Sequence, residues 1–237
     1  MNNNPQNIYV FDVGNTLIEK PSNIMVSTLA EDLVALQKNG NNIGIATMRN
    51  LTMLKELINQ VKFDFVIALN GAYVQCGNEV IVDKPIESKD FIQIKKALDY
   101  KQVQYKLYTK NDILSQEESN EKIYGIELKE CYDFVDELKA SFPSFVYHIW
   151  EKGKSCDIHS IDVSKAKAIE KVCNYFGIPI QKSIAFGDGF NDIEMFKVCG
   201  KSIAMETAPD QLKQVATFVT KSVKDNGVSW ALKEFQL

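Results

Sequence analysis

Short apolar strands alternate with amphipathic helices in the first part of this chain, and this alternation restricts the fold more than any other feature. Apolar runs predict buried strands at 8–13, 42–47 and 63–69. Apolar residues at helical spacing predict helices at 24–38 and 51–61. Strands that alternate with helices are joined by crossover connections, so this region predicts a parallel sheet.

The same alternation returns in the last part of the chain. The pattern there predicts a helix at 164–176, a strand at 183–186, a helix at 190–198, strands at 202–205 and 217–219, and a helix at 227–235. We therefore expect an α/β fold in which both ends of the chain build one Rossmann-like parallel-sheet core.

The middle of the chain has a different pattern. Strand-like stretches at 72–75 and 79–82 flank a short turn, and those at 145–150 and 155–159 flank a second one. Both pairs predict β-hairpins, which are antiparallel by construction. Between the hairpins the pattern predicts a helix, two strands and a second helix, together with a polar, exposed loop at 110–121. We therefore expect a core at 1–82 and 161–237, interrupted by an inserted α+β module at 83–160.

Composition excludes several classes of protein. The chain of 237 residues has 27 Lys and Arg against 31 Asp and Glu, which gives a net charge of −4. Without a basic excess we expect no nucleic-acid or membrane binding, although a local positive site can still hold a small anionic substrate. Apolar runs such as 65–69 are much shorter than the roughly 18 residues of a membrane-spanning helix. The N-terminus also lacks the pattern of a signal peptide.

The cysteines favour a reducing compartment. Their number is odd and none belongs to a Cys-x-x-Cys pair, which indicates reduced and mostly buried thiols. We therefore expect a cytoplasmic protein in which these residues have a packing role. The residues are Cys76, Cys131, Cys156, Cys173 and Cys199.

Polar residues that follow the predicted strands form the candidate site. Asp12, Thr47 and Asp188 each stand at the carboxyl end of a strand, which is the edge where open parallel sheets bind ligands. Lys165 stands in the first turn of the helix that re-enters the core. Two carboxylates, a hydroxyl and an ammonium together suit a phosphoryl group and a hard divalent cation.

The second carboxylate belongs to the stretch Gly187-Asp188-Gly189-Phe190-Asn191-Asp192. Asp188 and Asp192 are four residues apart across a glycine-rich turn that opens a helix. One direct and one water-linked carboxylate would suit Mg²⁺, which prefers oxygen ligands and retains several waters. Helix capping is the alternative explanation, because Asp and Asn favour that position. The stretch lacks the three-glycine spacing of a dinucleotide-binding fingerprint.

Over nearly its whole length the sequence resembles the haloacid dehalogenase superfamily of phosphohydrolases, in its Cof-like branch, subclass IIB. Four motifs stand in the family's order. The Cof-like branch has a further short motif after the third strand and further motifs in the C-terminal part, and this sequence matches them as well. The four motifs are Asp12-Val13-Gly14-Asn15-Thr16-Leu17, Thr47-Met48-Arg49, Val163-Ser164-Lys165 and Gly187-Asp188-x-x-Asn191-Asp192. The additional matches are Asn70-Gly71-Ala72, Ala204-Met205 through Ala208, Val219-Thr220 and Asn226-Gly227-Val228.

The resemblance implies a role for each motif residue. Asp12 would attack phosphorus and become an aspartyl-phosphate, so that one displacement is divided into two. Thr47 would donate a hydrogen bond to a phosphoryl oxygen, Lys165 would balance the charge of phosphate and nucleophile, and Asn191 would support phosphate binding. The resemblance therefore implies a small phosphorylated substrate. It does not indicate the oligomeric state.

The resemblance also implies a Mg²⁺ site. Asp12, the backbone carbonyl of Gly14, and Asp188 would hold the ion, with Asp192 in support. A bound cation offsets the repulsion between a carboxylate nucleophile and a dianionic phosphate ester. The inserted module at 83–160 would be the cap that covers the site and selects the substrate.

Position 14 departs from the family pattern. The family has an aspartate there, which protonates the leaving group and then deprotonates the attacking water, and Gly14 cannot transfer a proton. Asn15 replaces the family's glycine, but asparagine tolerates a positive φ, so the turn should survive. A positioned general acid–base is worth about 10² to 10⁴ in rate.

Three explanations of this departure stay open. The leaving group needs no proton, as in acyl or aryl phosphates; or the cap supplies the proton; or hydrolysis has been lost and the protein binds a phosphorylated ligand or partner. Candidate cap donors are Lys152, Lys154, His159 and the cap tyrosines, although strand residues such as His148 and His159 more often have only a structural role.

The sequence therefore predicts a Mg²⁺-dependent phosphohydrolase that acts on a small phosphorylated metabolite, with a sugar phosphate as one candidate. The main alternative is a weak or inactive pseudo-phosphatase that binds a phosphorylated ligand. A phospho-acceptor receiver domain would be roughly half as long and would lack the inserted module. A nicotinamide enzyme is disfavoured because no glycine fingerprint follows the first strand. A phosphonate hydrolase would have a smaller, helical cap.

Overall fold

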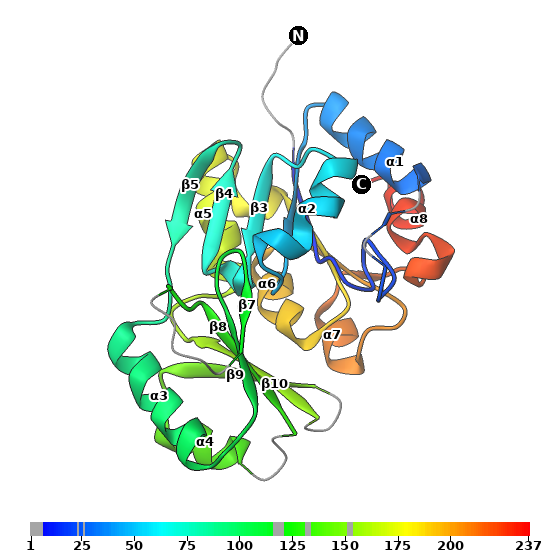
Figure 1. The fold of residues 1–237 in the computed structure, drawn as a ribbon. Helices are drawn as coiled ribbons and strands as arrows, with labels where there is room; N and C mark the ends of the chain where they lie inside the picture. The colour runs from blue at the N-terminus through cyan, green and yellow to red at the C-terminus, as the bar shows by residue number, and fades with distance from the viewer. Residues whose placement is uncertain (1–6, 23, 26, 116–120, 131–133, 151–153) are drawn as a thin grey trace.

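The computed structural model describes residues 7–22, 24, 25, 27–115, 121–130, 134–150 and 154–237, which form two β-sheets (Figure 1). The larger sheet has eight strands in the order β13-β12-β11-β1-β2-β3-β4-β5. Strands β13 to β3 are parallel, and β4 and β5 add an antiparallel hairpin at one edge. The expected parallel α/β core is confirmed. Its strands are β1 (Ile8–Phe11), β2 (Asn42–Ala46), β3 (Phe65–Ala68), β4 (Tyr73–Cys76), β5 (Glu79–Asp83), β11 (Ser183–Gly187), β12 (Lys201–Ala204) and β13 (Phe218–Val219).

Helices cover both faces of this sheet because its central strands are apolar on both sides. Successive side chains of β1 illustrate this. Phe11 packs in the cluster that includes Leu33 of α1, and Val10 packs in the cluster that includes Ile169 of α5. The first cluster joins α1 (Ser27–Lys38), α2 (Leu51–Gln60) and α8 (Gly227–Glu234); the second joins α5 (Lys165–Phe176), α6 (Ile193–Val198) and α7 (Asp210–Val215).

The smaller sheet is antiparallel and lies beyond one end of the larger one (Figure 1). Its five strands have the order β7-β6-β8-β10-β9, and helices α3 (Ser88–Tyr100) and α4 (Val135–Ser141) pack on one face. The side chains of Cys156 and Ile158 point to this helical face. The strands are β6 (Tyr105–Tyr108), β7 (Ile113–Leu114), β8 (Gly125–Lys129), β9 (Phe145–Trp150) and β10 (Ser155–Ser160).

Several boundaries differ from the sequence predictions. Helix α1 begins at Ser27 rather than at 24. The stretch 110–121, predicted to be a loop, contains the two-residue strand β7. The helix predicted at 190–198 begins as a 3₁₀ turn, η4 (Phe190–Asp192), before α6. Helix α7 was not predicted, because six residues with one buried side chain show no clear periodicity.

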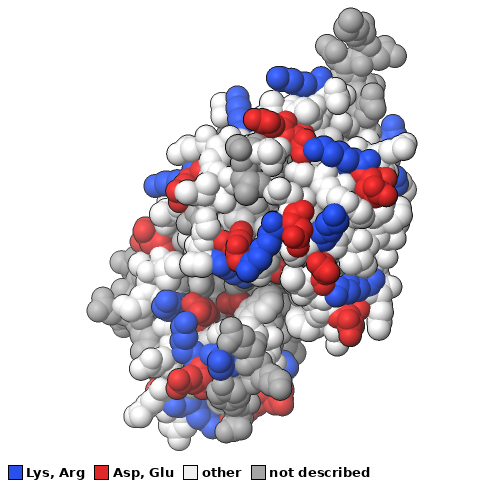
Figure 2. Space-filling model, turned by 90° about the vertical axis from the view of Figure 1, so that its right-hand side faces the viewer, with Lys and Arg blue, Asp and Glu red and all other residues white. Residues whose placement is uncertain are grey.

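Charged side chains of both signs are interspersed on the face shown in Figure 2, in keeping with a net charge of only −4. Among the described helices, none combines the length and the apolar character that crossing a bilayer requires. The four described cysteines form no disulfide and three of them are buried, while Cys131 lies outside the described residues.

Candidate active site

Three of the predicted site residues directly follow neighbouring parallel strands. Asp12 follows β1, Thr47 follows β2 and Asp188 follows β11, and these strands are adjacent in the sheet. The backbone N–H of Asp12 donates to the carbonyl of Phe186 at 2.9 Å, and that of Thr47 donates to the carbonyl of Ile67 at 2.9 Å. The sheet ladder therefore extends to these residues and brings their side chains to one edge.

Lys165 comes to the same edge from α5. It is the first residue of that helix, and the hydroxyl of Ser164 caps the helix by accepting from the Lys167 N–H at 3.2 Å. Its Nζ lies 2.7 Å from Oδ1 of Asp12 and 2.7 Å from Oδ1 of Asp192. Burial alone would lower the pKa of the Lys165 ammonium, but the two carboxylates together raise it, so the group keeps its charge.

Asp192 fixes the acidic loop. Its Oδ2 accepts from the backbone N–H of Asp188 at 3.0 Å and from that of Gly189 at 2.9 Å, while its Oδ1 accepts from Lys165. Both oxygens of this fully buried carboxylate are therefore occupied by donors from the chain itself. Asp192 thereby orients the turn that carries Asp188.

The acidic cluster has the chemistry of a magnesium site. Asp12, Asp188 and Asp192 offer oxygens that lie within 4.8 Å of one another. Burial and the charges of Asp12 and Asp192 raise the pKa of Asp188 to about 7. Carboxylates crowded in this way repel one another, and a divalent cation relieves that repulsion. Mg²⁺ prefers hard oxygen ligands of this kind, so the residues present fit the ion.

Two asparagines in left-handed backbone conformation tie the surrounding loops to the site. Asn15 has φ +56° and donates from Nδ2 to Oδ2 of Asp188 at 3.1 Å. Asn70 has φ +54°, and its backbone N–H donates to the carbonyl of Thr47 at 2.9 Å. Asn191 donates from Nδ2 to Oδ1 of Asn70 at 3.4 Å. The turn at Asn15 therefore survives the loss of glycine, as expected.

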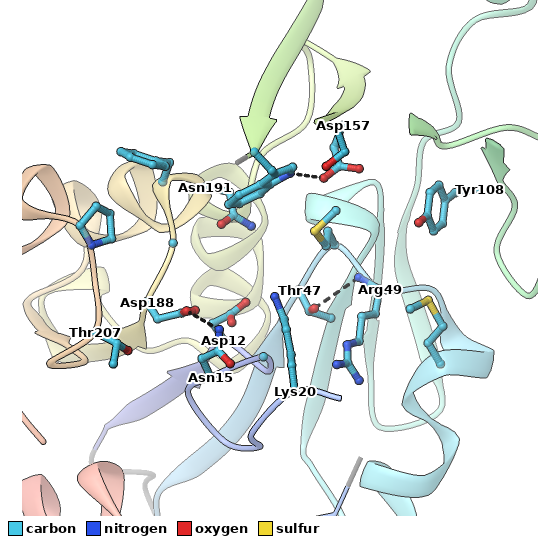
Figure 3. A pocket seen from close by; sticks show the side chains of 18 residues that line it. Asp12, Asn15, Lys20, Thr47, Arg49, Tyr108, Asp157, Asp188, Asn191 and Thr207 are labelled. Carbon is cyan, nitrogen blue, oxygen red and sulfur yellow. Dashed lines mark hydrogen bonds between the residues drawn. The ribbon is translucent and has the colours of Figure 1, made fainter. Parts of the chain in front are cut away.

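A cavity of about 630 Å³ opens over these residues, between the strand ends and the smaller sheet (Figure 3). Its size suits a small-molecule ligand. Asp12, Gly14, Asn15, Thr47, Asp188 and Asn191 line it from the larger sheet, together with Lys20 and Arg49. Tyr108, Trp150, Ser155 and Asp157 line it from the smaller sheet. Lys165 and Asp192 lie behind this lining and support it.

Two charged residues of the cavity were missed from the sequence. Asp157 is 7% exposed, accepts a hydrogen bond from Nε1 of Trp150, and has its pKa raised to about 7 by burial. The sequence did contain a signal for Asp157. It stands between the apolar Cys156 and Ile158 on a predicted strand, and because alternate residues of a strand face opposite sides, it faces away from the apolar side. Lys20 gave no signal of its own beyond its closeness to the unusual Gly14.

Among the described residues that the sequence offered as cap proton donors, one lines the cavity and the others do not. His148 and His159 face each other with their Nε2 atoms 3.0 Å apart, and burial lowers both pKa values, that of His148 to about 4. Lys154 lines a different cavity, and Lys152 lies outside the described residues. Among the cap tyrosines, Tyr108 lines the cavity over Asp12.

The sequence profile described as haloacid dehalogenase-like hydrolase matches residues 9–142 and 123–232. The chain belongs to the haloacid dehalogenase-like hydrolases. The family that four short motifs indicated is thereby confirmed, and with it the assignment as a hydrolase.

Relatives match this hydrolase over most of its length. The "Putative phosphatase YkrA" of Bacillus subtilis strain 168 is 28% identical over 250 residues, which cover 96% of this chain and 96% of YkrA. The 5-amino-6-(5-phospho-D-ribitylamino)uracil phosphatase YcsE of the same organism is 28% identical over 214 residues, 85% of this chain and 84% of YcsE. The solved structure of the subclass IIB sugar phosphatase BT4131 has a TM-score of 0.86 and 26% identity over 97% of this chain and 99% of that one.

Proposed function

We propose that this hydrolase cleaves the phosphate ester of a small phosphorylated metabolite through an aspartyl-phosphate on Asp12, and that it uses Mg²⁺. One observation carries the proposal. The Asp12 carboxylate lies at the cavity, 2.7 Å from a buried ammonium and beside Asp188, which offers a metal-binding oxygen. A carboxylate nucleophile, a fixed cation and a metal position are the parts that phosphoryl transfer to an aspartate requires.

The chain's own residues divide the work. Lys165 holds Asp12 in place and offsets its charge, so that the free carboxylate oxygen can face phosphorus. Thr47 and Asn191 line the cavity near Asp12 and would bind phosphoryl oxygens. Asp12, Asp188 and the Gly14 carbonyl would hold the metal, with Asp192 in support. A bound Mg²⁺ would offset the charge of the phosphoryl group.

The inserted module at 83–160 is proposed to act as the cap. Its sheet places Tyr108, Trp150, Ser155 and Asp157 over the cavity, and such a cover would exclude bulk water and contact the leaving group. An aromatic ring beside a buried carboxylate would suit the ring and hydroxyl groups of a sugar or polyol phosphate. That class also agrees with the names of BT4131 and YcsE. We propose a cytoplasmic location, in keeping with the lack of a disulfide among the four described cysteines.

Turnover with Mg²⁺ tests the proposal. Wild type and Asp12→Asn are compared on p-nitrophenyl phosphate and on a hexose phosphate, with the exposed Asp136→Asn as the matched control. We expect Asp12→Asn to abolish turnover and Asp136→Asn to leave it unchanged. Unchanged turnover in Asp12→Asn would refute the nucleophile.

Gly14 favours one second candidate, a pseudo-phosphatase that binds a phosphorylated ligand without turnover. Wild type separates the two candidates. Absence of turnover on both esters, in a sample shown by calorimetry to bind Mg²⁺ and inorganic phosphate, would favour the binding protein. Turnover of only the activated ester would identify the missing acid as the limitation.

A further inference from the structure

The space above Gly14 is filled by a lysine. A Cβ atom added to Gly14 would lie 2.3 Å from Cε and 3.2 Å from Nζ of Lys20. The first distance is closer than non-bonded carbon atoms approach. A side chain at position 14 and the present position of Lys20 therefore exclude each other. The family pattern has an aspartate at position 14. In this chain Gly14 has no side chain, and the side chain of Lys20 occupies the space that the aspartate side chain would need.

The loop between β1 and α1 holds Lys20 there. The backbone N–H of Asn15 donates to the carbonyl of Ile18 at 2.7 Å, and that of Ile18 donates back to Val13 at 3.1 Å. Leu17 and Ile18 are 2% and 1% exposed, so the loop is anchored in the core. The chain consequently turns back on itself, and Lys20 returns over Gly14.

The ammonium of Lys20 belongs to the reaction cavity. Lys20 lines the cavity together with Asp12 and Thr47, and Figure 3 shows its side chain rising between these two residues. Asp188 of the larger sheet and Asp157 of the smaller one line the same cavity, and the charge of Lys20 acts on both carboxylates. The ammonium of Lys20 therefore lies in the cavity between Asp12, at the strand ends of the larger sheet, and the smaller sheet.

Lys20 is also distinct from the lysine already described. Lys165 lies behind Asp12 with its ammonium held by two carboxylates, and it does not line the cavity. Among the described residues that line the cavity, Lys20 and Arg49 carry the positive charges. Arg49 is half-buried and burial lowers the pKa of its guanidinium, whereas the side chain of Lys20 is exposed.

We propose that Lys20 is a catalytic residue that takes the place of the missing carboxyl acid and stabilises the departing oxygen of the substrate by its positive charge. The proposal rests on the phosphohydrolase function proposed above. An oxygen of Asp12 forms a bond to phosphorus, and the bond from phosphorus to the leaving oxygen breaks. The electron pair of that bond stays on the leaving oxygen, which becomes an anion beside the ammonium. Lys20 keeps its proton, and the released anion takes one from water.

The mechanism has a consequence for substrate choice. Removing a group that stabilises developing negative charge costs about 10² to 10³ in rate in other enzymes. The benefit is largest where most charge develops, which is on a strongly basic leaving oxygen. Lys20 should therefore matter more for phenyl phosphate than for p-nitrophenyl phosphate, whose anion is stable by itself.

The experiment measures kcat/KM with Mg²⁺ on these two aryl esters. The variants are Lys20→Met, the charge-retaining Lys20→Arg, and Lys38→Met as a control at the exposed end of α1. We expect Lys20→Met to lose about 100-fold on phenyl phosphate and clearly less on p-nitrophenyl phosphate. Lys20→Arg should retain part of the rate, and Lys38→Met should match wild type. No loss in Lys20→Met, or an equal loss on both esters, overturns the proposal.

A second pair of variants tests whether position 14 and Lys20 share one role. Gly14→Asp restores the family's acid, but in the presence of Lys20 it meets the lysine side chain. We expect the double variant Gly14→Asp/Lys20→Ala to exceed Lys20→Ala by at least tenfold on phenyl phosphate, consistent with the worth of a general acid. A double variant no faster than Lys20→Ala overturns the shared role. Asp12→Asn distinguishes failure of the Lys20 proposal from failure of the proposed function. If Asp12→Asn retains turnover, the proposed phosphohydrolase mechanism itself is wrong.

Discussion

Nζ of Lys165 lies 2.7 Å from Oδ1 of Asp192, and both side chains are almost completely shielded from solvent, with exposed fractions of 1% and 0%. Each of these buried charges is stabilised by the opposite charge of its partner. Removal of one partner leaves an uncompensated charge in the interior, which costs about 3–5 kcal/mol in other proteins. This pair therefore supports the fold of the site as well as its chemistry.

Lys165→Met should lower the free energy of unfolding by about 3–5 kcal/mol and abolish turnover. The double variant Lys165→Met/Asp192→Asn should recover part of that stability, because the fully buried position 192 then carries no charge and only Asp12 is left without its ammonium partner, but it should not recover turnover. Urea unfolding and ester hydrolysis measure the two effects. A double variant less stable than Lys165→Met alone would contradict the pairing.

Mg²⁺ should stabilise the fold through Asp188. A ligand present at 100 times its Kd adds about 2.7 kcal/mol, which raises Tm by several degrees in a chain of this size. Asp188→Asn should lose most of this shift, and without metal it should be more stable than wild type at neutral pH, because the carboxylates no longer repel one another. Thermal unfolding with and without Mg²⁺ measures both effects, with Asp136→Asn as the control. An undiminished shift in Asp188→Asn would contradict this ligand assignment.

The sequence predicted the parts of this molecule that have strong local signals. Apolar runs located the central strands, and the rule that open parallel sheets bind ligands at the carboxyl ends of their strands placed Asp12, Thr47 and Asp188 at one edge. The structure adds their partners, such as the 2.7 Å contact from Lys165 to Asp12, across 153 positions of the chain. Short elements with few buried residues, such as β7 and α7, were missed because they owe their form to tertiary contacts.

The missed site residues have a different cause. The alternation on β10 indicates that Asp157 faces away from the helices, but it enters the cavity because the whole smaller sheet, with β10 paired to both β8 and β9, lies over the strand ends of the larger one, and local pattern does not predict that placement. Lys20 reaches Gly14 because the intervening loop folds back on itself. In both cases the position of the side chain in the cavity depends on how distant segments pack or on how a loop folds, and neither is predicted by the pattern of a single sequence.

Gly71→Ala should weaken the site from outside the cavity. Gly71 has φ +96°, and an added Cβ would lie 2.4 Å from the carbonyl oxygen of Ser164, the residue before Lys165. Both the backbone conformation and the overlap oppose a side chain, so we expect a loss of about 1–3 kcal/mol in unfolding free energy. Displacement of Lys165 should also lower kcat. Gly40→Ala is the matched control, since it has a positive φ but no neighbour within 4 Å, and it should lower stability without lowering kcat.

Asp157 should make the stability of the protein depend on pH. Burial raises its pKa from 3.8 to about 7 in the folded state, against a donated hydrogen bond from Trp150 that lowers it. The folded state therefore holds this proton more tightly than the unfolded state. The resulting stability is fully present below about pH 4 and is lost as pH rises to about 7. A shift of this size corresponds to at most about 4 kcal/mol.

Asp157→Asn removes this titration while its amide oxygen can still accept from Trp150. The variant should therefore gain stability relative to wild type as pH rises from 5 to 8, by a few kcal/mol. Urea unfolding of both proteins across that range measures the difference, and Asp136→Asn, whose side chain is 95% exposed, corrects for general effects of charge. A difference between variant and wild type that stays constant with pH would show that Asp157 is ionised throughout the range, and the buried, protonated carboxyl over the cavity would have to be abandoned.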